Sequence, residues 1–188
     1  MLPCCLYTYH TNVSLQAERA LEYFVARVNN SARMPFGKLI SGHSATLERL
    51  AHCRVEIDAA RLVVLNAAAQ IDAGNAKSAF VEIAASKIFV PEVALRVTDM
   101  AMQAHGGAGV SQDTPLARIW ANLRTMRIVD GPDEVHLQQL GKNENRKAKE
   151  LLAKLAAQKK AVDALFAQYG AELVDPLELN RVSGKAKL

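Results

Sequence analysis

The sequence predicts an all-α protein, an antiparallel bundle of about four to five long helices. Turn-forming residues are sparse, with 10 glycines and 6 prolines among 188 residues, and aromatic residues make up only 5% of the chain, which is unusual for an all-β protein. Apolar residues recur at alternating steps of three and four, and no stretch alternates convincingly with period two. Half of the residues are hydrophobic, which is enough to bury a core. The apolar runs all fall short of the roughly 18 residues that a membrane span needs.

The first helix is expected over residues 14–30, because Ser14 can cap its start and a pair of asparagines can close its end. Residues 1–13 form an atypical leader, which lacks both the basic start and the long apolar stretch of a signal peptide. A short non-helical segment follows the helix, since residues 31–44 contain Pro35 and two glycines.

Two longer helices are expected over residues 45–73 and residues 77–104. The apolar stripe of the first is Leu50, Cys53, Ile57, Ala60, Val64, Ala67 and Ile71. The apolar stripe of the second is Ile83, Val90, Val93, Val97, Met100 and Ala104. Pro91 lies inside the second of these helices, and we expect a kink there because its ring clashes with the carbonyl of Lys87.

A fourth helix is expected from Pro115 to Ile128, and a last long helix begins at about Asp133 and has a charged, solvated middle. The helical domain then spans residues 14–168. Residues 169–188 form a loose tail.

Charge and cysteine content bear on the possible partners. The net charge is +4 and the pI is near 9.0, but the basic residues form no dense block with interleaved aromatics, so we expect no nucleic-acid partner. The three cysteines make neither a disulfide framework nor a zinc set, and they fit a reducing compartment. We expect no metal site, because four of the histidines are scattered without facing carboxylates. These are His43, His52, His105 and His136.

The turn richest in glycine is HGGAGVSQDTP, residues 105–115. It is not a dinucleotide-binding loop of the usual kind, because it follows a helix and lacks a third glycine in register. It is not an esterase oxyanion hole, because the chain has no GxSxG motif. Bare glycine backbone can bring N–H groups close to an anion at the start of the next helix. The alternative is a plain tight turn between two helices.

Two further segments are candidates for chemistry. IVDGPDEVH places Asp130 before Gly131 and Pro132 at an acidic helix start, where the aspartate is either an ordinary helix cap or a reactive carboxylate. ARMPFGK places Arg33 before a turn that contains Phe36. A lone arginine in such a place is usually a surface charge.

The order RALEYFVARV, ARMPFGK, QAHGGAGVSQDTPLARIW and IVDGPDEVH resembles the C-terminal helical domain of the acyl-CoA dehydrogenases, which are flavoproteins. The resemblance covers residues 14–155, and the ordered set is far more specific than any one segment. It looks nearest to a subgroup that in animals includes long forms fused to a kinase-like domain. The resemblance implies α,β-dehydrogenation of an acyl-CoA thioester, with FAD as the cofactor.

The resemblance also implies a catalytic base. In the family, a carboxylate just before a glycine removes the α-proton of the substrate, which assigns that role to Asp130 and places the Gly131 backbone beside the thioester. The usual base is glutamate, and aspartate is shorter by roughly 1.5 Å, so the turn has to lie closer to the substrate or at another angle. Pro132 and Glu134 stand at flavin-contacting positions where the family commonly has threonine and glutamine.

The remaining implied contacts are with the ADP half of the flavin. Arg33 would reach the pyrophosphate of FAD in a neighbouring subunit, with Phe36 packed beside it, since arginine supplies a bidentate cation. Gln103, Gly106 and Gly107 would lie along the ADP, since glycine permits close backbone approach. Because the arginine serves another subunit, we expect a homo-oligomer, a dimer or a tetramer. We also expect the stripes of the second and third helices to remain partly uncovered within one chain.

Two features separate this chain from the family pattern. Gly42-His43-Ser44 stands where the family often has Gly-His-Gln, whose glutamine contacts the flavin. The N-terminal and β domains, which hold the isoalloxazine and much of the acyl-CoA site, are not in this sequence. The alternative function is therefore a non-catalytic, truncated helical module that serves oligomerisation.

The last three residues resemble a targeting signal. Ala186-Lys187-Leu188 resembles the Ser-Lys-Leu signal for peroxisomes, with a small residue, a basic residue and then leucine at the free carboxylate. We expect the protein in the peroxisome, with the mitochondrion or the cytoplasm as alternatives.

Overall fold

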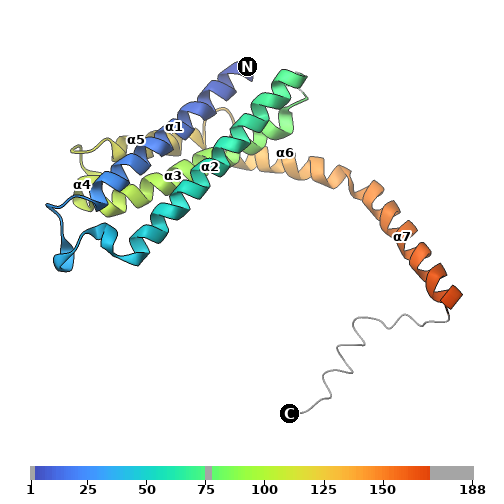
Figure 1. The fold of residues 1–188 in the computed structure, drawn as a ribbon. Coiled ribbons are helices and arrows are strands. Elements are labelled where there is room, and N and C mark those ends of the chain that lie inside the picture. The colour runs from blue at the N-terminus through green and yellow to red at the C-terminus, as the bar shows by residue number, and fades with distance from the viewer. Residues whose placement is uncertain (1–2, 75–77, 170–188) are drawn as a thin grey trace, which may run out of the picture. The chain divides into compact units, whose positions relative to one another are not determined.

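The computed structural model describes residues 3–74 and 78–169, with side chains from residue 12 onward. The chain falls into two compact units, residues 1–141 and residues 142–188. All regular structure in the described residues is helical (Figure 1). The first unit holds α1 (Pro3–Val28), α2 (Ser44–Ala73), α3 (Phe80–His105), α4 (Gly107–Val110), α5 (Leu116–Met126) and most of α6 (Asp133–Arg146), with the short 3-10 turns η1 (Pro35–Gly37) and η2 (Ile40–Gly42) between α1 and α2.

The first unit is a helical bundle in which α2 runs antiparallel to both α1 and α3 (Figure 1). Helix α3 contacts α1, α2, α4 and α5. The predicted all-α antiparallel bundle is confirmed. In the described residues, no helix is both long and apolar enough to cross a membrane.

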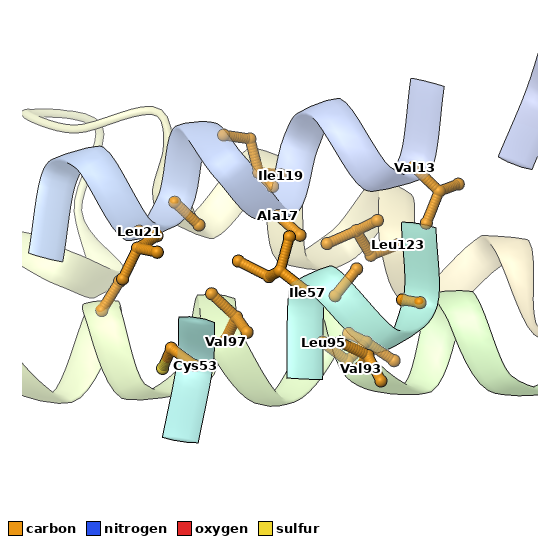
Figure 2. Close-up of a cluster of buried hydrophobic side chains, with 14 of the residues drawn as sticks. Val13, Ala17, Leu21, Cys53, Ile57, Val93, Leu95, Val97, Ile119 and Leu123 are labelled. Atoms are coloured by element: carbon orange, nitrogen blue, oxygen red, sulfur yellow. The ribbon is translucent and has the colours of Figure 1, made fainter. Parts of the chain in front are cut away.

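Side chains from α1, α2, α3 and α5 form the core of this unit (Figure 2). It includes Val13, Ala17, Leu21, Cys53, Ile57, Val93, Leu95, Val97, Ile119 and Leu123. Burying each large aliphatic side chain contributes about 1.5–3 kcal/mol, so this shared core holds the four helices in one arrangement.

Ion pairs fix α1 against α2. Arg54 donates from Nη1 and Nη2 to the two carboxylate oxygens of Glu18, at 2.9 and 2.7 Å, and Arg61 also binds this carboxylate. The Arg54 hydrogen bonds, together with the charge of Arg54 and Arg61, hold the pKa of Glu18 below its ordinary value. At the far end of α1, Arg27 donates to the backbone carbonyls of Ala104 and His105. The last turns of α1 and α3 are therefore tied together.

Several helix boundaries differ from the sequence prediction. Helix α1 begins at Pro3, so it extends through most of the expected leader. Helix α3 begins at Phe80 and continues through the buried Pro91. The single last helix is instead two, because α6 ends at Arg146 and α7 begins at Ala148. This break has neither proline nor glycine beside it, which is why the sequence pattern continues through it.

The stripes of the second and third helices are buried in their middle and only half-buried at their ends, at Leu50 and Ile71 of α2 and at Met100 and Ala104 of α3. On α2 the predicted stripe is buried over Cys53, Ile57, Ala60, Val64 and Ala67, and α3 buries most of its own stripe. The exposed apolar residues of α2 lie on the opposite face, where 67% of Val55, 66% of Leu62 and 50% of Leu65 remains accessible. The helix is therefore apolar on two faces, and only one face is covered within the chain.

The described part of the second unit consists chiefly of α7 (Ala148–Tyr169). None of its residues is buried. Its leucines Leu151, Leu152, Leu155 and Leu165 are all exposed.

Candidate functional site

The turn after α1 carries Arg33 and Phe36. Phe36 has a positive φ of 57° and is 96% exposed, and its ring meets the ring of His43 edge-on at 6.5 Å between centroids. Arg33 is exposed, with its backbone N–H bonded to the carbonyl of Asn30. A phenylalanine held in the left-handed region and pointed into solvent is unusual, because both the backbone and the exposed ring cost free energy.

The glycine turn closes α3. Gly106 adopts φ 63° and ψ −136°, which is a conformation for glycine, and its N–H is bonded to the carbonyls of Met102 and Gln103. A hollow of about 300 Å³ lies here. Its lining residues are Asp99, Met102, Gln103, Gly106, Gly107 and Val110. A Cβ added at Gly106 or Gly107 would have no atom within 4 Å, so their backbone is open to a ligand.

Gly109 has a different role from these two glycines. A Cβ at this residue would lie 2.4 Å from the carbonyl oxygen of Met102. The absence of a side chain thus lets α4 pack directly against the backbone of α3.

Asp130 and Gly131 form the turn between α5 and α6. Asp130 has φ 57° and Gly131 has φ 100°. Asp130 is exposed, as are Pro132 and Glu134 just after it. Within the chain the aspartate carboxylate faces solvent, so it is accessible to a partner molecule.

Buried charges lie beneath this turn. Lys87 of α3 is fully buried, and its Nζ donates to the carbonyl of Met126 at 2.6 Å. Arg127 donates from Nε to Oδ2 of the buried Asp133 at 2.6 Å, which joins the two ends of the turn. Burial lowers the pKa of Lys87, whereas the carboxylates of Asp133 and Asp130 act in the opposite direction.

Backbone strain coincides with the predicted site. In the described part of the chain, the non-glycine residues with positive φ are Phe36 and Asp130. Each is followed by a glycine that also has positive φ. Strained non-glycine residues concentrate at functional sites, where the surrounding structure imposes them.

The structure brings some predicted residues together and separates others. Gln103, Gly106 and Gly107 share one hollow. The loop of Arg33 leaves α1 at the same end of the bundle, where Arg27 joins α1 to the end of α3. The Asp130 turn is anchored at Lys87, and 15 residues of helix, about 22 Å, separate Lys87 from Met102 in the hollow. The residues predicted to bind ADP and the predicted base therefore lie far apart in one chain.

Sequence reasoning missed the residues that support the turn. Lys87, Arg127 and Asp133 received no role in the site. His136, whose Nε2 lies 3.4 Å from the carbonyl oxygen of Asp130, was considered only as a metal ligand. One signal was available for Lys87. It stands four residues after Ile83 and three before Val90, which places a charged residue within the apolar stripe.

Comparison with known proteins identifies the family. The acyl-CoA dehydrogenase C-terminal domain matches residues 12–145. The probable acyl-CoA dehydrogenase IBR3 of Arabidopsis thaliana is 47% identical over 135 residues, which is 72% of this chain and 16% of that protein. The probable acyl-CoA dehydrogenase FadE2 of Mycobacterium tuberculosis is 45% identical over 137 residues, 73% of this chain and 33% of that protein.

Solved structures agree with this assignment. Butyryl-CoA dehydrogenase from Megasphaera elsdenii is 30% identical and superposes with a TM-score of 0.67, covering 73% of this chain and 35% of that one. The chain spans a third or less of the length of the first curated relatives. Sequence and fold agree over most of its length, and this protein therefore belongs to the acyl-CoA dehydrogenase family, whose C-terminal helical domain it carries.

Proposed function

We propose that this chain supplies the C-terminal helical domain of an FAD-dependent acyl-CoA dehydrogenase, which removes hydrogen from the α and β carbons of an acyl-CoA thioester. One observation carries the proposal. Among the described residues, the strained non-glycine positions are Phe36 and Asp130, and both belong to segments that the family resemblance assigns to the site. Both side chains are exposed, so packing into the core does not account for either conformation.

Asp130 is the proposed base. Its carboxylate would take the α-proton of the thioester, and the backbone of Gly131 would lie beside the thioester group. Bound FAD would supply the acceptor for the β-hydrogen and its electron pair. The Arg127–Asp133 pair would keep the turn closed while Asp130 holds the proton. Asp130 is exposed in the chain, so the exclusion of water that a base needs has to come from the substrate and from the other domains.

The glycine hollow fits part of a dinucleotide. Relatives in this family depend on FAD, and the open space beside Gly106 and Gly107 would let a phosphate or ribose approach the backbone. Gln103 lines the same hollow and would bond the ADP. Arg33, in the loop that leaves α1 at this end, would supply the charge for the pyrophosphate. Phe36, Pro132 and Glu134 are proposed as further flavin neighbours.

We also propose that the working protein is a homo-oligomer. The ADP-binding group and the base lie about 22 Å apart along α3, so a complete site would take the two groups from different subunits. The exposed apolar face of α2, with Val55, Leu62 and Leu65, offers a surface for such a partner.

The base assignment is tested by grafting residues 12–145 into the mycobacterial relative in place of its own matching domain. The graft should bind flavin, and an acyl-CoA should bleach it under anaerobic conditions. Asp130→Asn should keep both ligands and slow bleaching at least about a hundredfold. Asp113→Asn, at an exposed aspartate outside the proposed site, is the matched control. Normal bleaching by Asp130→Asn would show that another group is the base.

The isolated chain separates this proposal from a non-catalytic module. It holds only the ADP side of the flavin site, whose hydrogen bonds contribute about 0.5–3 kcal/mol each, while ordering a ligand on half a site costs several kcal/mol. We expect weak FAD binding in a fluorescence titration and no bleaching by acyl-CoA. An oligomerisation module would show no FAD binding at all, and the graft would bind no flavin.

We propose the peroxisome as the location, on the basis of Ala186-Lys187-Leu188, which lies outside the described residues. A fluorescent tag at the N-terminus should mark peroxisomes. Deletion of Leu188 should move the signal to the cytosol, and an unchanged distribution would contradict the proposal.

A further inference from the structure

Lys87 is the largest of the fully buried side chains in the described residues, with 0% of its surface accessible. It lies on α3, among the aliphatic residues of the core-facing stripe. Burying an ammonium group costs several kcal/mol unless it is paired and hydrogen-bonded. Such a residue therefore needs a specific reason to be there.

The hydrogen bond of Lys87 ends at the last residue of α5. Its Nζ donates to the carbonyl of Met126 at 2.6 Å. The final carbonyls of a helix lack partners within the helix, and they carry the negative end of its dipole. The ammonium group satisfies one of them, four residues before Asp130, and so fixes the point from which the turn leaves α5.

The other side of the turn faces the same ammonium group through Asp133, which begins α6. Asp133 is 6% exposed, and its Oδ2 accepts from Arg127. Its Oδ1 is buried, with no hydrogen-bond partner in the structure. The carboxylates of Asp133 and Asp130 both attract the Lys87 ammonium, and Arg127 repels it. The positive charges of Lys87 and Arg127 are therefore matched in number by carboxylates only if Asp130 is included with Asp133.

We propose that Lys87 is a positioning residue for Asp130, because its buried ammonium group holds the Met126 carbonyl at one end of the turn and attracts the Asp133 carboxylate at the other. The significance for catalysis rests on the proposed function of Asp130 as the base. The mechanical role of Lys87 does not depend on it, so the two can fail separately.

Lys87 can be observed directly in the wild-type chain. In ¹⁵N-labelled protein at low temperature, the ammonium of Lys87 should give an NMR signal whose hydrogens exchange with water at least roughly tenfold more slowly than those of Lys154. Lys154 is the matched control, since it is ion-paired to Glu150 at 2.7 Å but is 69% exposed. Exchange of Lys87 as fast as that of Lys154 would overturn the proposal.

A variant tests the consequence for the turn. Lys87→Met keeps an unbranched side chain that is one atom shorter, and it removes the charge and the donors. The amides of Ile128 and Val129, which donate to the carbonyl of Thr125, should then exchange at least roughly tenfold faster. The control is Val97→Ala, a core change on the same helix at a fully buried position. Val97→Ala should speed amide exchange throughout the bundle and not selectively in this turn.

The outcomes separate the two ideas. Selective loosening of the turn in Lys87→Met supports positioning by Lys87, and equal loosening in both variants overturns it. Where Lys87→Met does not fold, the exchange of the wild-type ammonium decides alone. If the Asp130→Asn graft reduces flavin normally, the base assignment fails, but the exchange results and the mechanical role remain as they are.

Discussion

Substituting Gly109 by alanine tests how α4 is held against α3. The new Cβ would lie 2.4 Å from the carbonyl oxygen of Met102, 2.8 Å from its Cα and 2.9 Å from its carbonyl carbon. Contacts this short do not occur, and the atoms in the way are backbone atoms of a long helix that cannot rotate aside. Helix α4 has to move by about 1 Å to reach ordinary contact distance.

The cost follows from overpacking. Forcing a methyl group into a closed site costs about 1–3 kcal/mol. At about 2–4 °C per kcal/mol for a chain of this size, Gly109→Ala should lower Tm by roughly 2–12 °C. Trp120, the single tryptophan, lies on the neighbouring α5, so its fluorescence during urea unfolding reports on this unit.

Gly107→Ala is the matched control, two residues earlier in the same short helix. Its Cβ would have nothing within 4 Å, so stability should stay within about 0.5 kcal/mol of the wild type. The methyl group would occupy the open side of the hollow, so FAD affinity should fall. If Gly109→Ala is as stable as Gly107→Ala, the close packing of α4 on α3 is wrong.

Three other measurements check independent parts of the structure. Burial raises the pKa of Cys53 to about 11. In a chain that carries Cys4→Ser and Cys5→Ser, labelling of Cys53 by a thiol reagent at pH 8 should therefore be roughly a hundredfold slower than labelling of an ordinary thiol. Equal rates would contradict the burial of Cys53. The pKa of Glu18 is lowered, chiefly by its hydrogen bonds to Arg54, so its contribution to stability is present above its unfolded pKa and is lost as the pH falls through the folded pKa. Glu18→Gln should therefore be less stable than the wild type at neutral pH, and in urea titrations the gap should close as the pH falls through the lowered pKa of Glu18. A gap independent of pH would refute the ion pair. Light scattering should give the wild-type chain a mass above that of a monomer, and Val55→Glu/Leu62→Glu should lower it without unfolding the bundle; a monodisperse wild-type monomer at micromolar concentration would contradict the proposed interface.

Helix periodicity was sufficient to predict the core. The stripe from Cys53 to Ala67 is buried as a unit, because residues at steps of three and four share one face of a helix whatever its partners are. The same reasoning did not reveal that α2 carries a second apolar face, with Val55, Leu62 and Leu65, which is more exposed than the stripe. Alanine and leucine cover α2 on two sides, and spacing alone does not tell which side meets α1 and α3. The break at Lys147 also escaped prediction, because nothing in the local sequence interrupts the helix pattern.

The candidate site was also predicted only in part. Motifs made of neighbouring residues, such as Asp130-Gly131 and Gly106-Gly107, are visible in the sequence because their chemistry depends on residues adjacent in the chain. The support of the Asp130 turn depends on Lys87, 43 residues earlier. No spacing rule relates two residues on different helices, so this partnership requires the fold.

The two strained turns also constrain what completes the site. A non-glycine residue in the left-handed region costs about 1–2 kcal/mol, and less where it is an aspartate, which visits this region more readily. Phe36 is 96% exposed and meets the ring of His43 edge-on, and Asp130 is exposed as well. The backbone of the Asp130 turn is held by Lys87 and by the Arg127–Asp133 pair, but neither exposed side chain packs into the core. Under the proposed function, the flavin and the substrate would dock on these turns, near opposite ends of α3, and would compensate for the cost. A bundle without ligands gains nothing from a non-glycine residue at either position, so the presence of Phe36 and Asp130 there fits the proposed function.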